Sequence, residues 1–287
     1  MVLEPVRAAL RRTPVHVAWR FGVATIGARR EAGALAGVET YCLFIGHPRS
    51  GHSIVGALLD AHPEMTVSDE LDALRYVSAG FTRDQVLYLS VRTARHQAAH
   101  QRRKLGRGGT YSYHVPGQWQ GRFRRLRVVG DSRAGWTVRR LSSDPALLRR
   151  LEQRMRPLEL RFIHVVRNPF DNISTMVIRG GRTLEDAIAR YFANCRSLVD
   201  LRTAIGAERL LTMRHEDLIA DPRRQLTDAC RLLGVSPTDE YLDACAGVLY
   251  ARPSRSRSEV DWPEGARRRV ARLIDEYEFL RAYSFDE

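Results

Sequence analysis

Residues 41–63 restrict the possible folds of this chain more than any other stretch. Residues 41–45 are apolar and β-prone, Gly46 interrupts them, and a helical pattern begins at His52. A strand that leads through a short loop into a helix presents the free backbone N–H groups of the first helical turn, and the helix dipole adds to their attraction for negative charge. The segment therefore predicts an anion-binding loop between a buried strand and a helix.

The loop carries groups that suit a phosphate or sulfate. Gly51 allows close backbone approach, Ser53 adds a hydroxyl donor, and Arg49 supplies a fixed set of N–H donors. The spacing from Gly46 is one residue short of the phosphate loop of nucleoside triphosphatases, and His52 stands where that loop needs a lysine. A neutral imidazole does not neutralise β- and γ-phosphates as lysine does, so an ordinary triphosphatase is disfavoured.

Strand and helix patterns alternate along the rest of the chain. Apolar runs predict strands at 40–46, 65–68, 126–130, 160–166 and 208–213, and helical patterns occupy about 52–61, 83–103, 145–155, 183–203 and 222–233. This alternation predicts an α/β fold with a mostly parallel sheet flanked by helices. The Gly-, Arg- and Tyr-rich segment 104–125 predicts a long loop. We expect one domain at 40–287 and an arginine-rich extension at 1–39.

A second segment, residues 161–176, again has a buried strand that ends in a basic residue. Arg167 follows the strand, and Pro169 begins a helix that carries Ser174 and Thr175. Taken alone, the pattern would equally suit a strand-end arginine paired with Asp171. Following the first loop along the chain, it predicts a second anion contact.

Together these segments resemble the binding motifs of sulfotransferases that use 3′-phosphoadenosine 5′-phosphosulfate. The Pro-Arg-Ser-Gly loop at 48–51 resembles the family's 5′-phosphosulfate loop, and Arg167 and Thr175 resemble the arginine and hydroxyl of its 3′-phosphate motif. Segment 253–262 is similar to the late loop that closes over the nucleotide. The resemblance implies a P-loop-like fold, an acceptor hydroxyl and no metal. The donor contacts that it implies are Arg49, Ser50, Gly51, His52, Ser53, Arg167, Ser174, Thr175, Arg255 and Arg257.

Sulfuryl transfer also needs a base for the acceptor proton and donors for the leaving phosphate, for which Arg49 is suited. Glu70 resembles the catalytic glutamate of tyrosylprotein sulfotransferases, because it lies 21 residues past Arg49, directly after a short strand. Asp69 is the adjacent candidate, although both carboxylates could simply complement a helix dipole. His114 lies in a turn that superficially resembles the one with the histidine base of phenol and steroid sulfotransferases.

One position departs from the family pattern. After the strand at 126–130, relatives often carry a lysine that assists the bridging oxygen, whereas this chain has Asp131, Ser132 and Arg133. Arg133 is the candidate to substitute, although a guanidinium and an ammonium differ in shape and hydration.

Composition narrows the possible partners. The net charge of +13 favours anionic ligands, but no nucleic-acid module accompanies the basic clusters, so no specific nucleic-acid partner is expected. The four cysteines lack metal-ligand spacing, and neither a signal peptide nor a membrane span is evident, which favours the cytoplasm. The expected partner is a small-molecule or glycan acceptor. Two other classes stay open: an ATP-dependent kinase with a degenerate phosphate loop, and a non-catalytic protein that binds nucleotides or polyanions.

Overall fold

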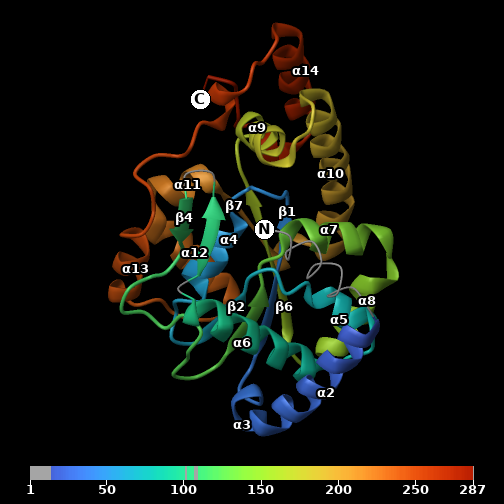
Figure 1. The fold of residues 1–287 in the computed structure, drawn as a ribbon, viewed down its shortest axis with the longest axis vertical. Coiled ribbons are helices and arrows are strands. Elements are labelled where there is room, and N and C mark those ends of the chain that lie inside the picture. The colour runs from blue at the N-terminus through green and yellow to red at the C-terminus, as the bar shows by residue number, and fades with distance from the viewer. Residues whose placement is uncertain (1–13, 101, 107–108, 287) are drawn as a thin grey trace.

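The computed structural model describes residues 14–100, 102–106 and 109–286. Its centre is a sheet of five parallel strands in the order β2-β5-β1-β6-β7, seen edge-on among helices in Figure 1. The strands are β1 Thr40–Gly46, β2 Met65–Ser68, β5 Val128–Asp131, β6 Glu159–Val166 and β7 Leu210–Arg214. The α/β class and the parallel sheet expected from the alternating pattern are confirmed.

The two faces of the sheet are covered because its central strand is apolar on both sides. All seven residues of β1 are buried. Tyr41, Leu43 and Ile45 join one hydrophobic cluster, and Cys42 and Phe44 join another on the opposite face. A continuous apolar strand of this kind is typical of a parallel sheet packed between helical layers.

The helices divide between these two clusters and a third one. The first layer contains α2 Pro14–Arg30, α5 Ala73–Ser78, α6 Arg83–Ala99, α7 Ala134–Ser143, α8 Ala146–Met155 and the later part of α10 Leu184–Ile205. The second contains α4 His52–Leu59, α11 His215–Ala220, α12 Pro222–Leu233 and α13 Asp239–Ala246. Beyond the carboxyl end of β6, α9 Pro169–Gly180 and α14 Glu264–Asp275 pack with the start of α10. Short elements complete the fold: α3 Ala32–Leu35, η1 Ala207–Arg209, η2 Ser256–Glu259 and η3 Glu278–Leu280.

Local signals set several of these boundaries. Thr82 begins α6 with a capping box in which its side chain and that of Gln85 each accept a backbone N–H. Pro169 and Pro222 occupy the first turn of α9 and α12, where a missing N–H costs nothing. The elements that frame the site are therefore encoded close to the residues that they present.

The prediction of a long loop at 104–125 is wrong in its first part. Strands β3 Arg103–Gly106 and β4 Gly109–Ser112 pair as an antiparallel hairpin, and α6 ends at Ala99 rather than near 103. Both strands are only four residues long and mostly polar, so no apolar alternation marks them in the sequence.

The arginine-rich extension contains a helix that sequence patterns did not predict. Ala24 and Ala28 of α2 are buried in the same cluster as Tyr41, and α2 packs along α6. The first thirteen residues of the extension lie outside the described part of the chain. A boundary between residues 39 and 40 stays a prediction.

Candidate active site

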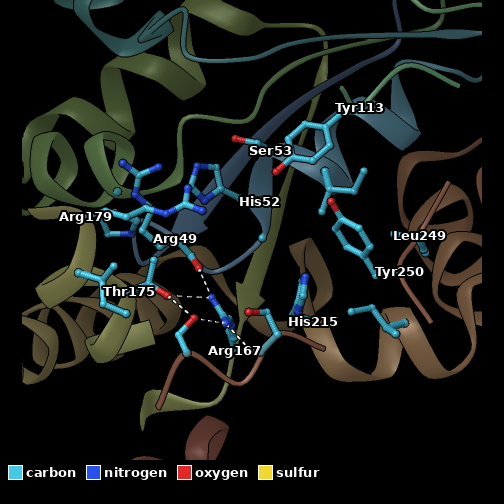
Figure 2. Close-up of a pocket in the computed structure, with 18 of the residues that line it drawn as sticks. Arg49, His52, Ser53, Tyr113, Arg167, Thr175, Arg179, His215, Leu249 and Tyr250 are labelled. Atoms are coloured by element: carbon cyan, nitrogen blue, oxygen red, sulfur yellow. Dashed lines mark hydrogen bonds between the residues drawn. The ribbon is translucent and has the colours of Figure 1, made fainter. Parts of the chain in front are cut away.

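The loop after β1 opens into a cavity of about 740 Å³ at the carboxyl ends of the strands (Figure 2). Ligands of open parallel sheets collect at this edge. In Figure 2, Arg49, Thr175 and Arg167 lie on one side of the cavity, and Tyr113, Leu249 and Tyr250 lie on the other. The predicted site residues that line it are Arg49, Gly51, His52, Ser53, Glu70, Arg133, Arg167 and Thr175.

The loop backbone adopts conformations that ordinary residues avoid. Gly51 has a φ of 98°, and a Cβ at this position would lie 2.3 Å from Cδ2 of His215. Arg49 has a φ of 70° although it carries a side chain. Left-handed backbone at a non-glycine residue persists only where the surroundings enforce it, and such positions concentrate at functional sites.

Three loop side chains differ in what they face. Arg49 is exposed and lines the cavity, whereas Ser50 is buried and does not. The Ser50 hydroxyl has no hydrogen-bond partner among the described residues. Ser53 lines the cavity while its Oγ donates to Oδ1 of Asp69 at 3.1 Å.

Arg167 joins three segments at the base of the cavity. Its Nη1 lies 3.2 Å from Oγ1 of Thr175 and 3.4 Å from the carbonyl oxygen of Arg49. Its Nη2 donates to the carbonyl of Ser254 at 2.7 Å and to the hydroxyl of Ser256 at 3.3 Å. Burial lowers the pKa of Arg167, but a guanidinium stays charged at any working pH. A buried cation therefore faces the cavity beside two hydroxyl groups.

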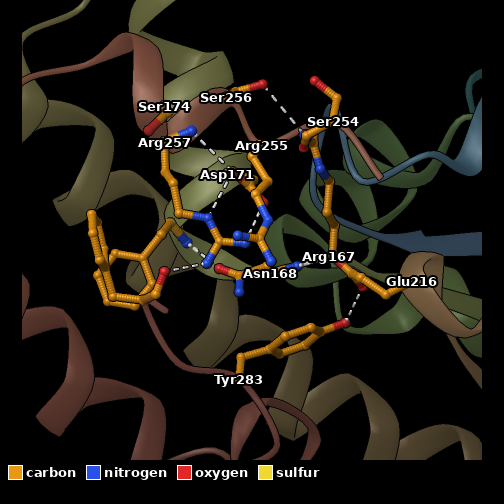
Figure 3. A network of polar contacts seen from close by, with 12 residues as sticks. Arg167, Asn168, Asp171, Ser174, Glu216, Ser254, Arg255, Ser256, Arg257 and Tyr283 are labelled. Atoms are coloured by element: carbon orange, nitrogen blue, oxygen red, sulfur yellow. Dashed lines mark hydrogen bonds and ion pairs between the residues drawn. The ribbon is translucent and has the colours of Figure 1, made fainter. Parts of the chain in front are cut away.

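Asp171 pairs with Arg257, not with Arg167 (Figure 3). The Arg257 guanidinium donates to both carboxylate oxygens of Asp171, at 3.1 and 2.9 Å, and also to the carbonyls of Ser284 and Phe285. Arg257 lies outside the lining of the cavity, and so does Arg255. Ser174 also points elsewhere, since its hydroxyl accepts a hydrogen bond from the Trp262 indole at 2.9 Å.

Another part of the lining is formed by residues that follow β2 and β5. Glu70 lines the cavity with its side chain 55% exposed, and Nη1 of Arg133 donates to its carbonyl oxygen at 2.9 Å. The Arg133 guanidinium lies over the ring of Trp136, 5.4 Å from its centroid. Asp69 is buried and absent from the lining, and its Oδ1 accepts from Ser53 and Ser132.

The structure does not bring His114 to this cavity. Its Nδ1 lies 3.2 Å from Oε1 of Gln120, and it lines a separate cavity of about 310 Å³ with Arg95 and Arg122. The preceding residue, Tyr113, lines the main cavity instead.

Sequence reasoning missed several lining residues. His215 begins α11 directly after β7, the neighbour of β6, so its place at the carboxyl edge could have been inferred from strand order. Burial, with a smaller contribution from nearby Arg167, lowers the pKa of His215 to about 4, so the ring is neutral at pH 7. Other missed residues are Tyr113, Trp136, Arg179, Ile219, Val248, Leu249, Tyr250 and Arg252. These carried no local motif.

Among the described residues, no group of three or more His, Cys, Asp or Glu side chains is arranged to hold a metal ion. No helix in this part of the chain has both the length and the apolar character needed to cross a membrane.

Comparison with known proteins identifies relatives. A family model described as "Sulfotransferase family" matches residues 43–240. The sulfotransferase domain of the Synechococcus PCC 7002 olefin synthase is 20% identical, over 84% of this chain and 94% of that domain, with a TM-score of 0.52. The sulfotransferase domain of the curacin biosynthetic pathway is 16% identical, over 84% of this chain and 99% of that domain, with a TM-score of 0.49. A sulfotransferase from Alicyclobacillus acidocaldarius is 16% identical, over 84% of this chain and 94% of that protein, with a TM-score of 0.47. No curated protein sequence matches the chain. The likeness to the Synechococcus domain supports the same fold.

Proposed function

Because this chain belongs to the sulfotransferase family, we propose that it is an enzyme that moves a sulfuryl group from 3′-phosphoadenosine 5′-phosphosulfate to an acceptor hydroxyl. The observation that carries the choice of donor is the convergence of two anion contacts, at the carboxyl ends of β1 and β6, on one cavity. One is the loop of Arg49 and the first turn of α4. The other is Arg167 with the hydroxyls of Thr175 and Ser256.

The donor has two anionic groups that match these contacts. The loop N–H groups and Arg49 would bind the phosphosulfate, where negative charge grows on the leaving phosphate. Arg167, Thr175 and Ser256 would bind the 3′-phosphate. Arg257 serves this second contact indirectly in our proposal, because its pairing with Asp171 fixes the segment that carries Ser254 and Ser256.

For the transfer, the acceptor oxygen forms a bond to sulfur while the bond from sulfur to the 5′-phosphate oxygen breaks, leaving its electron pair on the phosphate. The acceptor proton passes to the Glu70 carboxylate. Two observations support Glu70 over its neighbour: Glu70 lines the cavity, and Asp69 is buried with two serine hydroxyls. Removing a general base typically lowers rate by about 10² to 10⁴.

Donor binding is tested by thermal unfolding with 3′-phosphoadenosine 5′-phosphate and with adenosine 5′-phosphate. A ligand at 100 times its Kd adds about 2.7 kcal/mol to the free energy of unfolding, so the first nucleotide should raise Tm clearly and the second much less. In Arg167→Ala the two shifts should become similar. Equal shifts in the unmodified protein would contradict a 3′-phosphate contact.

Turnover is tested by incubating the protein and this donor with panels of hydroxyl-bearing small molecules and glycans, and measuring a mass gain of about 80 Da, the mass of a sulfuryl group, on each acceptor. Activity should survive EDTA, since a kinase needs magnesium to bridge phosphates and sulfuryl transfer does not. Glu70→Gln should lower kcat with little change in donor affinity. Asp69→Asn and His114→Ala are the controls, and a dead His114→Ala beside an active Glu70→Gln would reassign the base.

A further inference from the structure

The turn that carries Glu70 has an unfavourable backbone. Glu70 has a φ of 61° and Asp72 a φ of 65°, so two residues with side chains are left-handed on either side of Leu71. A residue with a Cβ is less stable in this conformation than in an ordinary right-handed or extended one, because the Cβ crowds the neighbouring carbonyl oxygen. Contacts from elsewhere in the fold must hold this turn in place.

A buried carboxylate from the neighbouring strand makes those contacts. Asp131, the last residue of β5, is paired in register with Ser68 of β2 and is 1% exposed. Its Oδ1 accepts from the backbone N–H of Leu71 at 3.2 Å, and its Oδ2 accepts from that of Ala73 at 2.9 Å. Ala73 begins α5, and the residue before it makes no side-chain cap. Asp131 therefore caps α5 from outside and spans the strained turn.

Two arginines that follow Asp131 hold the same turn. Arg133 donates to the carbonyl oxygen of Glu70 at 2.9 Å. Arg140 of α7 binds both carboxylate oxygens of Asp72, each at 2.6 Å. Segment 131–140 thus secures the backbone and flank of the turn, while the Glu70 side chain extends into the cavity.

We infer that Asp131 is a positioning residue for Glu70: by accepting from the amides of Leu71 and Ala73, its two carboxylate oxygens fix the left-handed turn that aims the Glu70 carboxylate at the acceptor. The inference rests on the proposed function, in which Glu70 removes the acceptor proton. Asp131 touches neither donor nor acceptor in this role.

A double-mutant cycle tests the coupling. Asp131→Asn keeps the size of the side chain but replaces one acceptor with an NH₂ group that opposes a backbone N–H. Alone, it should lower kcat by about 10- to 100-fold with donor affinity nearly unchanged, and in the Glu70→Gln background by less than about 3-fold. Hydrogen exchange of the amides in 69–76 should be faster in Asp131→Asn whatever residue occupies position 70.

Asp60→Asn is the control for a loss of stability away from the base. Asp60 is also buried and accepts two backbone N–H groups, from Val67 at 2.8 Å and Gly121 at 2.9 Å, and it does not contact the Glu70 turn. It also pairs with the buried guanidinium of Arg102, so this control should lose at least as much stability as Asp131→Asn. Its effect on kcat should be the same in both backgrounds. If Asp131→Asn does not fold, Asp131→Ser, which retains one acceptor, replaces it.

The outcomes separate the two claims. If Asp131→Asn lowers kcat equally with Glu70 present and in the Glu70→Gln background, or does not lower it in the unmodified protein, the positioning role is overturned. If Glu70→Gln keeps normal turnover, the proposed base is wrong. In that case hydrogen exchange alone tests whether Asp131 stabilises the turn, and unchanged exchange rates in 69–76 would show that it does not.

Discussion

Gly51 occupies a backbone position that a side chain would disturb in two ways. Its φ is positive, and the space that a Cβ would need is already taken by the ring of His215. The close contact between loop and ring means that the loop after β1 is shaped by the first residue of α11 as well as by its own strand. A mutation at Gly51 can therefore separate the cost of backbone conformation from the cost of collision.

Gly51→Ala should destabilise the fold by more than Gly80→Ala and should weaken donor binding by more than about 10-fold, or about 1.4 kcal/mol. Gly80 has a similar φ of 85° but open space around its Cβ position, so it reports the conformational cost alone, about 1–2 kcal/mol. Urea unfolding and calorimetric titration with 3′-phosphoadenosine 5′-phosphate measure the two effects. His215→Ala in the Gly51→Ala background should restore part of the loss. Equal costs at both glycines would show that the collision is relieved without penalty.

Adjacent residues with the same chemistry also show what sequence patterns cannot decide. Asp69 and Glu70 are both carboxylates after the same strand, and only the left-handed turn directs one to the cavity and the other into a buried contact with Ser53. Neither glycine nor asparagine marks that turn in the sequence. The sequence left three candidates for the proposed base, Glu70, Asp69 and His114, and only the tertiary structure shows that Glu70 alone among them lines the main cavity.

At the scale of elements, the strand-loop-helix units at β1–α4 and β6–α9 were predictable because apolar runs, glycines and a helix-starting proline act locally. The position of Arg257 outside the cavity was not predictable, because Arg167 and Arg257 are both arginines beside hydroxyl-rich motifs. The pairing of Arg257 with Asp171 depends on how η2 packs across α9. The hairpin of β3 and β4 was missed because its strands are short and polar.

The ion pair between Asp171 and Arg257 attaches η2 to α9, and both side chains are at least nine-tenths buried. Asp171→Asn should cost about 3–5 kcal/mol of unfolding free energy, because it leaves a buried guanidinium without its counter-charge. It should also weaken donor binding, since Ser254 and Ser256 precede Arg257 in the same segment. Glu264→Gln, which breaks an exposed pair with Arg268, is the control and should cost less than about 1 kcal/mol. Chemical denaturation of the unmodified protein and the two variants measures these differences. If Asp171→Asn loses no more free energy of unfolding than Glu264→Gln, the ion pair does not hold η2 on α9.

At the scale of the whole molecule, buried neutral histidines set the response to acid. Burial lowers the pKa of His47 and of His215 to about 4 and lowers that of His164 well below its ordinary value. Below about pH 6.5 the unfolded chain binds protons at these positions while the folded chain does not. Stability from these groups is therefore lost as pH falls from about 6.5 to 4. Burial raises the pKa of Asp131 to about 7, so the folded chain binds a proton there before the unfolded chain does. This group therefore adds stability as pH falls over the same range, opposite to the histidines.

Comparing the unmodified protein with a variant of one histidine separates the pH dependence due to that histidine from the pH dependence due to Asp131. His47 is buried and its Nε2 lies 3.0 Å from the carbonyl oxygen of Tyr191, a contact that His47→Gln can replace with a neutral donor. The unmodified protein should be more stable than His47→Gln at pH 7.5, and this gap should shrink by about 1–2 kcal/mol at pH 5.0, at up to about 1.4 kcal/mol per pH unit. Urea titrations at both pH values give the gap. His96→Gln, at an exposed position on α6, is the control, and a gap for His47→Gln that does not change with pH would contradict the linkage.

The order in which the cavity lining occurs along the chain has a consequence for how acceptor choice can change. The two proposed donor contacts come from residues 48–54 and from Arg167 with Thr175 and Ser256, and the stretch 70–136 between them contributes Glu70 and Tyr113 to the lining. Leu249 and Tyr250, which lie on the same side as Tyr113 in Figure 2, come from later in the chain. Under the proposed function, one recombination cassette thus encodes the base, its support and one part of the acceptor side. Chimaeras that exchange this stretch between relatives should shift acceptor preference and should leave nucleotide recognition with the recipient.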